Sequence, residues 1–147
     1  MTTEEIINRL KDFALFEDIA HNHDQITRVA AILDSRHIKA GEYIMKQGDH
    51  GEELYILMSG AVRVCKNTKQ NEEYTIVDLK AEYNVFFGEI ALMDSDLRSA
   101  SIKVLDDCDV LVMGKDKFIE LGNQFPEICL PITRTIGKKI CSNLRNA

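Results

Sequence analysis

Tryptophan is absent from the 147-residue sequence, proline occurs twice, and no hydrophobic run reaches the about 18 residues that a membrane-spanning helix needs. The N-terminus, Met1 to Glu5, is acidic, whereas a secretory signal peptide begins with basic residues. Cysteine is scarce and shows neither Cys-x-x-Cys spacing nor a histidine at zinc-ligand spacing: Cys65, Cys108, Cys129 and Cys141. These absences argue against a membrane span, export and a disulfide framework, and they predict a cytoplasmic protein with reduced cysteines.

Basic residues are outnumbered by acidic ones, which gives a formal net charge of −6. A nucleic-acid-binding surface needs the opposite sign, so we expect no DNA partner. Only His37 and His50 fall in the region of expected strands, and neither belongs to a His-x-His pair. A metalloenzyme of the cupin type needs two or three histidines and a carboxylate around one metal ion. Such an enzyme is therefore a remote alternative, and we expect neither a metal site nor an enzymatic activity.

The spacing of hydrophobic residues divides the chain into three parts. Helical spacing predicts one helix over Thr3–Phe16 and a second that is capped by Asn22. The middle part alternates hydrophobic and polar residues in short runs between turn signals, which is typical of a β-sandwich or roll. A short helix that ends at Gly122 and a long helix from Pro126 follow. We expect one domain, 1–147, with N-terminal helices over 1–33, a β-roll over 34–114 and C-terminal helices over 115–147.

The last of these helices combines an internal proline with a wide hydrophobic stripe. Pro131 is expected to kink the helix or to delay its start. The stripe occupies every fourth position: Ile128, Ile132, Ile136, Ile140 and Leu144. Because a row of this spacing drifts by about 40° per step, it covers about 160° of the helix surface. A face of that width predicts two neighbours, the roll and a second copy of the chain, with packing on the roll alone as the alternative.

The segment 87–101 carries the residues with the most distinctive chemistry. Phe87 ends a predicted strand, Gly88 allows a turn, one helical turn follows, and Arg98 comes after a polar loop at 94–97. Glycine lets a ligand approach the backbone, and the first N–H groups of a helix lack intrahelical partners. The planar guanidinium of arginine suits a phosphate. The segment therefore indicates an anion site; a plain connection in which Arg98 pairs with a neighbouring aspartate is the alternative.

The order of these residues resembles the phosphate-binding cassette of cyclic-nucleotide-binding domains, which reads F-G-E-[LI]-A-L, a short loop, then R-[ATS]-A. Every position of that pattern is filled here. The resemblance implies that Glu89 accepts a hydrogen bond from the ribose 2′-hydroxyl, that Arg98 binds the cyclic phosphate, and that Ser99 adds a donor. The residues that it assigns to the ligand are Phe87, Gly88, Glu89, Ile90, Ala91, Arg98, Ser99 and Ala100.

A second stretch, outside the cassette, supports the same resemblance. The glycines at 41, 48 and 60 fall where the roll of that family turns, between runs that match its strands. One departure is visible in residues 79–85, where the family usually has a Gly-Asp pair and this chain has no glycine. Asn84 is the residue there that best tolerates a left-handed conformation, so we expect a differently shaped loop with Asn84 at its turn.

The resemblance, to domains of the catabolite-activator and protein kinase A regulatory-subunit type, implies a mainly β fold with flanking helices. The expected core is a jelly-roll-like double-stranded β-helix with a C-terminal lid helix. The implied function is a cyclic nucleotide sensor or regulatory module, with cyclic AMP expected ahead of cyclic GMP, since Ser99 is compatible with both. Val64 is expected to contact the purine from the roll and Asn143 from the last helix. A degenerate roll that binds no nucleotide and acts as a scaffold is the alternative.

The resemblance also bears on partners and cofactors. DNA-binding members of the family continue from the last helix into a helix-turn-helix, whereas this sequence stops at Ala147, so we expect a stand-alone domain. Some relatives hold an iron–sulfur cluster on N-terminal cysteines, and no such cysteines occur here. We therefore expect a cyclic nucleotide as the ligand, no further cofactor, and a homodimer formed through the last helix.

Overall fold

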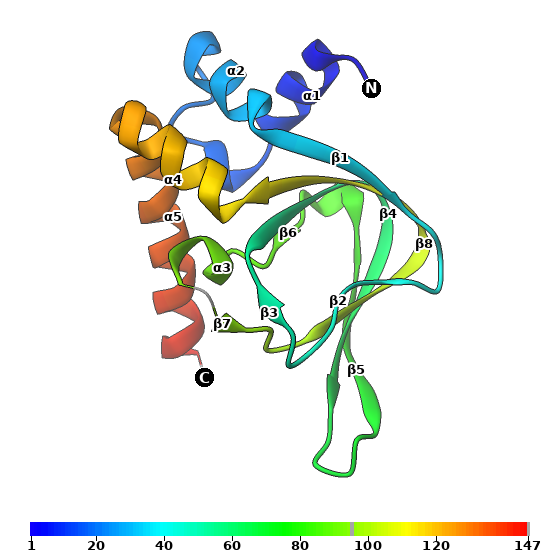
Figure 1. The fold of residues 1–147 in the computed structure, drawn as a ribbon. Helices are drawn as coiled ribbons and strands as arrows, with labels where there is room; N and C mark the ends of the chain where they lie inside the picture. Colours follow the sequence, from blue (N-terminus) through cyan, green and yellow to red (C-terminus); the bar gives the residue numbers. More distant parts are fainter. Residues whose placement is uncertain (95, 147) are drawn as a thin grey trace. The chain divides into compact units, whose positions relative to one another are not determined.

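A computed structural model describes residues 1–94 and 96–146. Of Asp96 it describes the backbone only. Ser95, in the predicted cassette, and Ala147 lie outside the described residues. The chain forms two compact units, one from residues 1–33 and 113–147 and the other from residues 34–112 (Figure 1). The first unit is helical and the second consists mainly of antiparallel strands, so the predicted mainly β fold with flanking helices is confirmed.

The N-terminal part of the helical unit contains α1 (Thr3–Leu10), a 3₁₀ turn (Ala14–Phe16) and α2 (His23–Ala31). The prediction of one helix over Thr3–Phe16 was wrong, because the chain turns extended at Phe13 and buries that ring together with Leu10. The predicted cap of the next helix is confirmed: the Asn22 side chain accepts a hydrogen bond from the backbone N–H of Gln25. Among the helices in the described part of the chain, none has the length and hydrophobicity needed to cross a membrane.

The C-terminal part of the helical unit contains α4 (Lys115–Gln124) and α5 (Pro126–Arg145). Gly122 does not end α4 as predicted. It lies inside the helix, where a Cβ would come within 3.3 Å of the Cys129 side chain on α5, so the glycine allows these two helices to approach closely. Pro131 lies inside α5 and does not delay its start, since the helix begins at Pro126.

The described residues of the strand unit form these strands: β1 (Leu33–Ile38), β2 (Tyr43–Met45), β3 (His50–Gly51), β4 (Glu53–Asn67), β5 (Glu73–Lys80), β6 (Phe86–Phe87), β7 (Asp96–Leu97) and β8 (Ser101–Gly114). The main sheet has the order β1-β8-β4-β5, with β2 paired to β8 and β6 to β4, while β3 and β7 pair separately. In Figure 1 the β4–β5 hairpin extends beyond the other strands of this unit. Hydrophobic side chains fill the interior, among them Leu57, Val62, Ile102, Val104, Val110 and Val112. Each fully buried side chain of this size contributes roughly 1.5–3 kcal/mol to folding.

The loop before β6 places the start of the cassette. Residues Ala81–Tyr83 form a 3₁₀ turn, and Asn84 follows with φ 57° and ψ 54°, the left-handed conformation predicted for it. The chain then pairs with β4, with Phe87 opposite Tyr55. This pairing positions the residues that follow Phe87 next to the beginning of β4.

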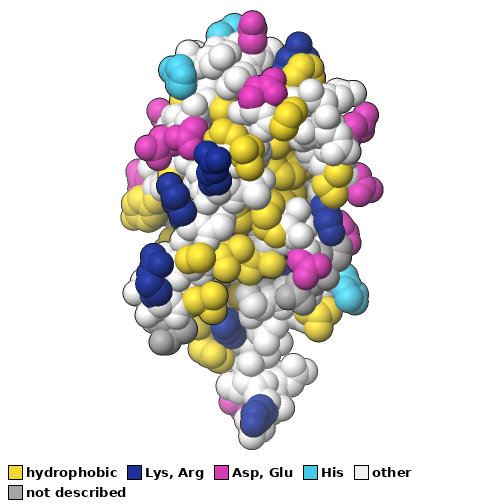
Figure 2. Space-filling view, turned by 90° about the vertical axis from the view of Figure 1, so that its left-hand side faces the viewer, with side chains coloured by type: hydrophobic (Ala, Val, Ile, Leu, Met, Phe, Trp, Pro, Cys, Tyr) yellow, Lys and Arg dark blue, Asp and Glu magenta, His cyan; other side chains and the backbone are white. Residues whose placement is uncertain are grey.

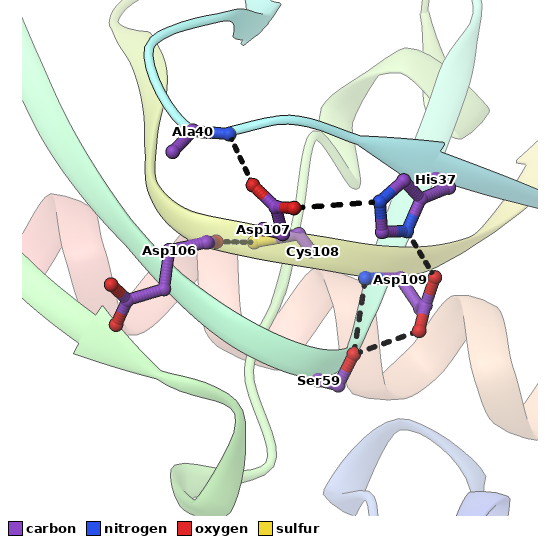
Figure 3. Close-up of polar contacts among 7 residues, drawn as sticks. All are labelled: His37, Ala40, Ser59, Asp106, Asp107, Cys108 and Asp109. Atoms are coloured by element: carbon purple, nitrogen blue, oxygen red, sulfur yellow. Dashed lines mark hydrogen bonds and ion pairs between the residues drawn. The ribbon is translucent and has the colours of Figure 1, made fainter.

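A polar cluster joins β1, β4 and β8 at the surface of the strand unit (Figure 3). The Nδ1 atom of His37 lies 2.8 Å from the Asp109 carboxylate, which also accepts a hydrogen bond from the Ser59 hydroxyl. The Asp107 carboxylate accepts from the Ala40 backbone N–H and lies 3.8 Å from Nε2 of His37. The hydrogen bond to Asp109, with the charges of both aspartates, raises the pKa of His37 above its ordinary value, although exposure to solvent screens these charges.

The raised pKa of His37 predicts a pH-dependent contribution to stability. A group whose pKa is higher in the folded state stabilises fully below its unfolded pKa, about 6.5, and this contribution disappears as pH rises through the folded pKa. The Tm of the wild type should therefore fall relative to that of His37→Gln between about pH 6 and pH 9. Calorimetric melting at both pH values measures this, and Asp109→Asn should reduce the difference, because the Asp107 charge remains. A Tm gap independent of pH would refute the assignment.

Candidate functional site

The backbone around Arg98 is held by an unusual pair of short strands. β3 and β7 pair so that His50 lies opposite Leu97. Just beyond this pair, the Arg98 N–H donates to the Asp49 carbonyl at 2.7 Å, and the Arg98 carbonyl accepts from the Gly48 N–H at 2.9 Å. The loop predicted over 94–97 thus contains a two-residue strand, because its backbone finds partners in a turn far away in the sequence.

The side chain of Arg98 is buried, with 8% of its surface exposed. One guanidinium nitrogen, Nη2, donates to the backbone carbonyl of Glu53 at 2.7 Å, and Nη1 donates to that of Gly88 at 3.3 Å. The guanidinium carbon lies 5.6 Å from the centre of the Tyr55 ring. A buried cation needs such acceptors and a polarisable neighbour, because it has lost its hydration. These contacts fix the orientation of the guanidinium before any ligand arrives.

Two glycines make room for this side chain. A Cβ on Gly51 would overlap the guanidinium of Arg98. A Cβ on Gly88 would lie 2.8 Å from Nη1 of Arg98 and 3.0 Å from the Glu53 carbonyl, and Gly88 also has a φ of +80°. The sequence pattern identified Gly88 but not Gly51, although Gly48, three positions earlier, was expected at a turn of the roll.

The other predicted cassette residues differ in how far they are buried. Glu89 is buried and immediately precedes α3 (Ile90–Met93), and Phe87 is buried with its ring centre 5.7 Å from that of Tyr55. Ala91 and Ala100 are buried, whereas Ile90 and Ser99 are exposed. The helical turn is tight, since the N–H of Ala91 donates to the Gly88 carbonyl at 3.2 Å. Of the cassette residues that the structure describes, Gly88 contacts the Arg98 guanidinium, through its carbonyl.

The two residues predicted to contact a purine lie in different units. Val64 packs on the core of the strand unit and is paired with Val77 of β5, which places the two side chains on one face of the sheet. Val77 is 42% exposed and was not predicted, although the alternation in β5 could have indicated it. Asn143 lies on α5 in the helical unit and is exposed. Its contact with a ligand stays a prediction.

A second group missed by the sequence analysis lies behind Arg98. The Glu53 carboxylate accepts two hydrogen bonds from Arg36 of β1, at 3.2 and 2.7 Å, and one from the Tyr55 hydroxyl at 3.0 Å. Burial by itself would raise the pKa of Glu53, but hydrogen bonds from Arg36 and Tyr55 and the charges of both arginines hold it below its ordinary value. Within residues 1–94 and 96–146, no cluster of histidine, cysteine and acidic side chains suits a metal ion.

The close packing at Gly88 predicts a measurable cost of adding one methyl group. Gly41 has a similar φ of +91° but no atom within 4 Å of the Cβ position, so Gly41→Ala is a matched control for backbone strain. Gly41→Ala should cost about 1–2 kcal/mol in the free energy of unfolding, and Gly88→Ala at least about 1 kcal/mol more. Urea denaturation measures both values. Equal losses would mean that the contact between Gly88 and Arg98 is not tight.

Comparisons with known proteins identify sequence relatives. The family model described as cyclic nucleotide-binding domain matches residues 35–125. A cGMP-dependent protein kinase of Drosophila melanogaster, isozyme 2 forms cD5/T2, is 31% identical over 121 residues, which are 81% of this chain and 13% of the kinase. The human cGMP-dependent protein kinase 2 is 30% identical over 85% of this chain and 16% of the kinase. The chain thus spans only 13–16% of the length of these two relatives.

Solved structures share the fold over most of the chain. A cyclic nucleotide-binding domain from Methylobacillus flagellatus has a TM-score of 0.81 at 20% identity and covers 98% of this chain and 79% of its own. The regulatory domain of Toxoplasma gondii PKA, crystallised with cAMP, has a TM-score of 0.78 at 20% identity, covering 95% and 50%. The Thermus thermophilus catabolite activator protein gives 0.76 at 25% identity, covering 90% and 58%. These likenesses confirm the predicted roll.

Proposed function

The chain belongs to the cyclic nucleotide-binding domain family, and we propose that it is a sensor or regulatory module that binds one cyclic nucleotide per chain. The observation that carries this proposal is the buried guanidinium of Arg98, which two backbone carbonyls orient beside Gly88. A cation held in place in this way recognises an anion without having to be ordered first, which favours affinity.

The proposed binding mode gives each cassette residue one task. Arg98 donates to the oxygens of the cyclic phosphate, and the Ser99 hydroxyl adds a donor. The Glu89 carboxylate accepts from the ribose 2′-hydroxyl. Gly88, Ile90 and Ala91 bring backbone close to the phosphate, with Phe87 and Ala100 packed behind them. Val64 lies against the purine, and we add Val77, its exposed partner on β5.

Cyclic AMP is the ligand we propose first, with cyclic GMP second. The exposed Ser99 is compatible with both nucleotides, and the names of the similar proteins include both cGMP-dependent kinases and a PKA domain crystallised with cAMP. Both nucleotides should therefore be measured in parallel. The cytoplasmic location, the absence of an enzymatic activity, the lid role of α5 and the contact of Asn143 with the purine stay predictions.

We predict that Arg98→Lys weakens nucleotide binding roughly 10–100-fold, because the loss of a two-pronged charge-assisted contact costs about 1.5–3 kcal/mol. Isothermal titration calorimetry with cyclic AMP and cyclic GMP measures the affinity, and the Tm of each protein without nucleotide controls for folding. Equal affinity of the variant would refute the phosphate role of Arg98. A wild type that binds neither nucleotide up to millimolar concentration would instead support the scaffold alternative.

The proposal includes a homodimer formed through α5, with a smaller contact face than the sequence predicted. Three residues of the predicted stripe, Ile128, Ile132 and Ile136, are buried within the chain and cannot face a partner. Hydrophobic side chains nevertheless reach the surface in Figure 2. On α5, Leu130 is 50% and Leu144 72% exposed. These two lie about 40° apart around the helix, so one partner surface can cover both.

We predict that Leu144→Asp converts a dimer into a monomer at tens of micromolar protein, because it places a charge in the proposed contact. Sedimentation equilibrium measures the mass of each protein. Ile119→Asp is the matched control, since Ile119 is 45% exposed but lies on α4, and it should leave the dimer intact. A monomeric wild type would exclude the dimer.

A further inference from the structure

Glu53 contacts the proposed phosphate-binding arginine through its backbone while its side chain faces elsewhere. Its carbonyl oxygen accepts from Nη2 of Arg98 at 2.7 Å. Its carboxylate, on the same residue, accepts instead from both terminal nitrogens of Arg36 and from the Tyr55 hydroxyl. Glu53 therefore bonds to Arg98 through its backbone, whereas the hydrogen bonds of its carboxylate go to Arg36 and Tyr55.

Carboxylates and phosphates compete for guanidinium groups, because both present two oxygens to the same planar set of donors. A Glu53 carboxylate released from Arg36 would have the Arg98 guanidinium within its own neighbourhood, since Arg98 already bonds to the backbone carbonyl of the same residue at 2.7 Å. Tyr55 contacts both groups: its ring lies beside the Arg98 guanidinium and its hydroxyl donates to the Glu53 carboxylate.

We propose that Arg36 is a positioning residue for nucleotide binding, which engages both carboxylate oxygens of Glu53 and so keeps this carboxylate from occupying Arg98 in place of the phosphate. The inference rests on the proposed function of Arg98. It assigns a role to a residue of β1 that lies outside the cassette and 17 positions from Glu53 along the chain.

If the Arg36–Glu53 pair were only a structural salt bridge, the substitutions would affect nucleotide binding differently. The side chains of Arg36 and Glu53 are 47% and 32% exposed, and a pair at that exposure adds little to stability. If the pair only held β1 against β4, removal of either partner would have the same effect, and removal of both would not restore binding. If Arg36 prevents competition, the loss of Arg36 is harmful only while the Glu53 charge is present.

The test is a double-mutant cycle in the full chain with Arg36→Gln, Glu53→Gln and both together, titrated with cyclic AMP by calorimetry. We expect Arg36→Gln to weaken binding about tenfold, Glu53→Gln to stay within about threefold of the wild type, and the double variant to return to within about threefold. Arg36→Lys, which keeps the charge with fewer donors, should fall between the wild type and Arg36→Gln. Loss of affinity in both single variants without restoration in the double variant would overturn the proposal.

Arg63→Gln is the matched control for breaking an exposed bidentate pair. Arg63 bonds Asp78 at 2.7 and 3.0 Å across β4 and β5, with exposures of 39% and 48%. Its loss should leave the affinity for cyclic AMP unchanged. An equal loss of affinity in Arg63→Gln would mean that any weakened pair disturbs the roll, and the specific role of Arg36 would be rejected.

A ligand-free readout separates this inference from the proposed function. The ¹⁵N resonance of the Arg98 Nε–H group, assigned by its disappearance in Arg98→Lys, should shift in Arg36→Gln and return in the double variant. If the wild type binds neither nucleotide, the proposed function fails, while this shift still reports whether Glu53 moves onto Arg98. An Arg98 resonance that stays the same in Arg36→Gln would overturn the positioning role, whatever the affinities are.

Discussion

A buried guanidinium must be given hydrogen-bond acceptors, and much of the strand unit is arranged around this requirement at Arg98. The carbonyls of Glu53 and Gly88 accept its protons, and Gly51 and Gly88 leave the space that it fills. The short β3–β7 pair holds the backbone on which it stands. Removal of any one of these supports would leave a charged group buried without its partners, which costs more than the lost contact itself.

The beginning of β4 connects this cation to the rest of the unit. Glu53 contacts Arg98 with its carbonyl and Arg36 with its carboxylate, and Tyr55 contacts Arg98 with its ring and Glu53 with its hydroxyl. Through Arg36 the network reaches β1, which is joined again to β8 and β4 by His37 and its aspartate partners. An edge strand that is far from the cassette in the sequence is therefore part of the electrostatic environment of Arg98.

The sequence predicted those features that depend on neighbouring residues. The strand, turn and helical turn from Phe87 onward, the left-handed Asn84 and the Asn22 cap are all set within a few positions, where propensity and spacing carry information. The contacts of Arg98 with Glu53, 45 positions away, and of Glu53 with Arg36 depend on how strands pair, which no local pattern encodes. The prediction that Gly122 ends a helix was wrong for a related reason. This glycine lets a second helix approach closely, and that contact depends on tertiary packing, which a local sequence pattern does not show.

Electrostatics explains why the pairing of acidic groups matters in this protein. A chain with a formal net charge of −6 would repel a nucleotide anion at long range, but salt largely screens the repulsion between charges that are more than about 10 Å apart. In the proposed binding mode, affinity therefore depends on short-range contacts, in which one desolvated guanidinium outweighs distant acids. A single carboxylate at hydrogen-bonding distance would cancel that advantage.

Three carboxylates in the described strand unit each have a basic partner. Glu53 is bonded to Arg36, Asp78 to Arg63 and Asp109 to His37. Of these three residues, Glu53 is the one that also bonds to Arg98, through its backbone carbonyl, so under the proposed phosphate role of Arg98 the partner of Glu53 is the one that affects ligand binding.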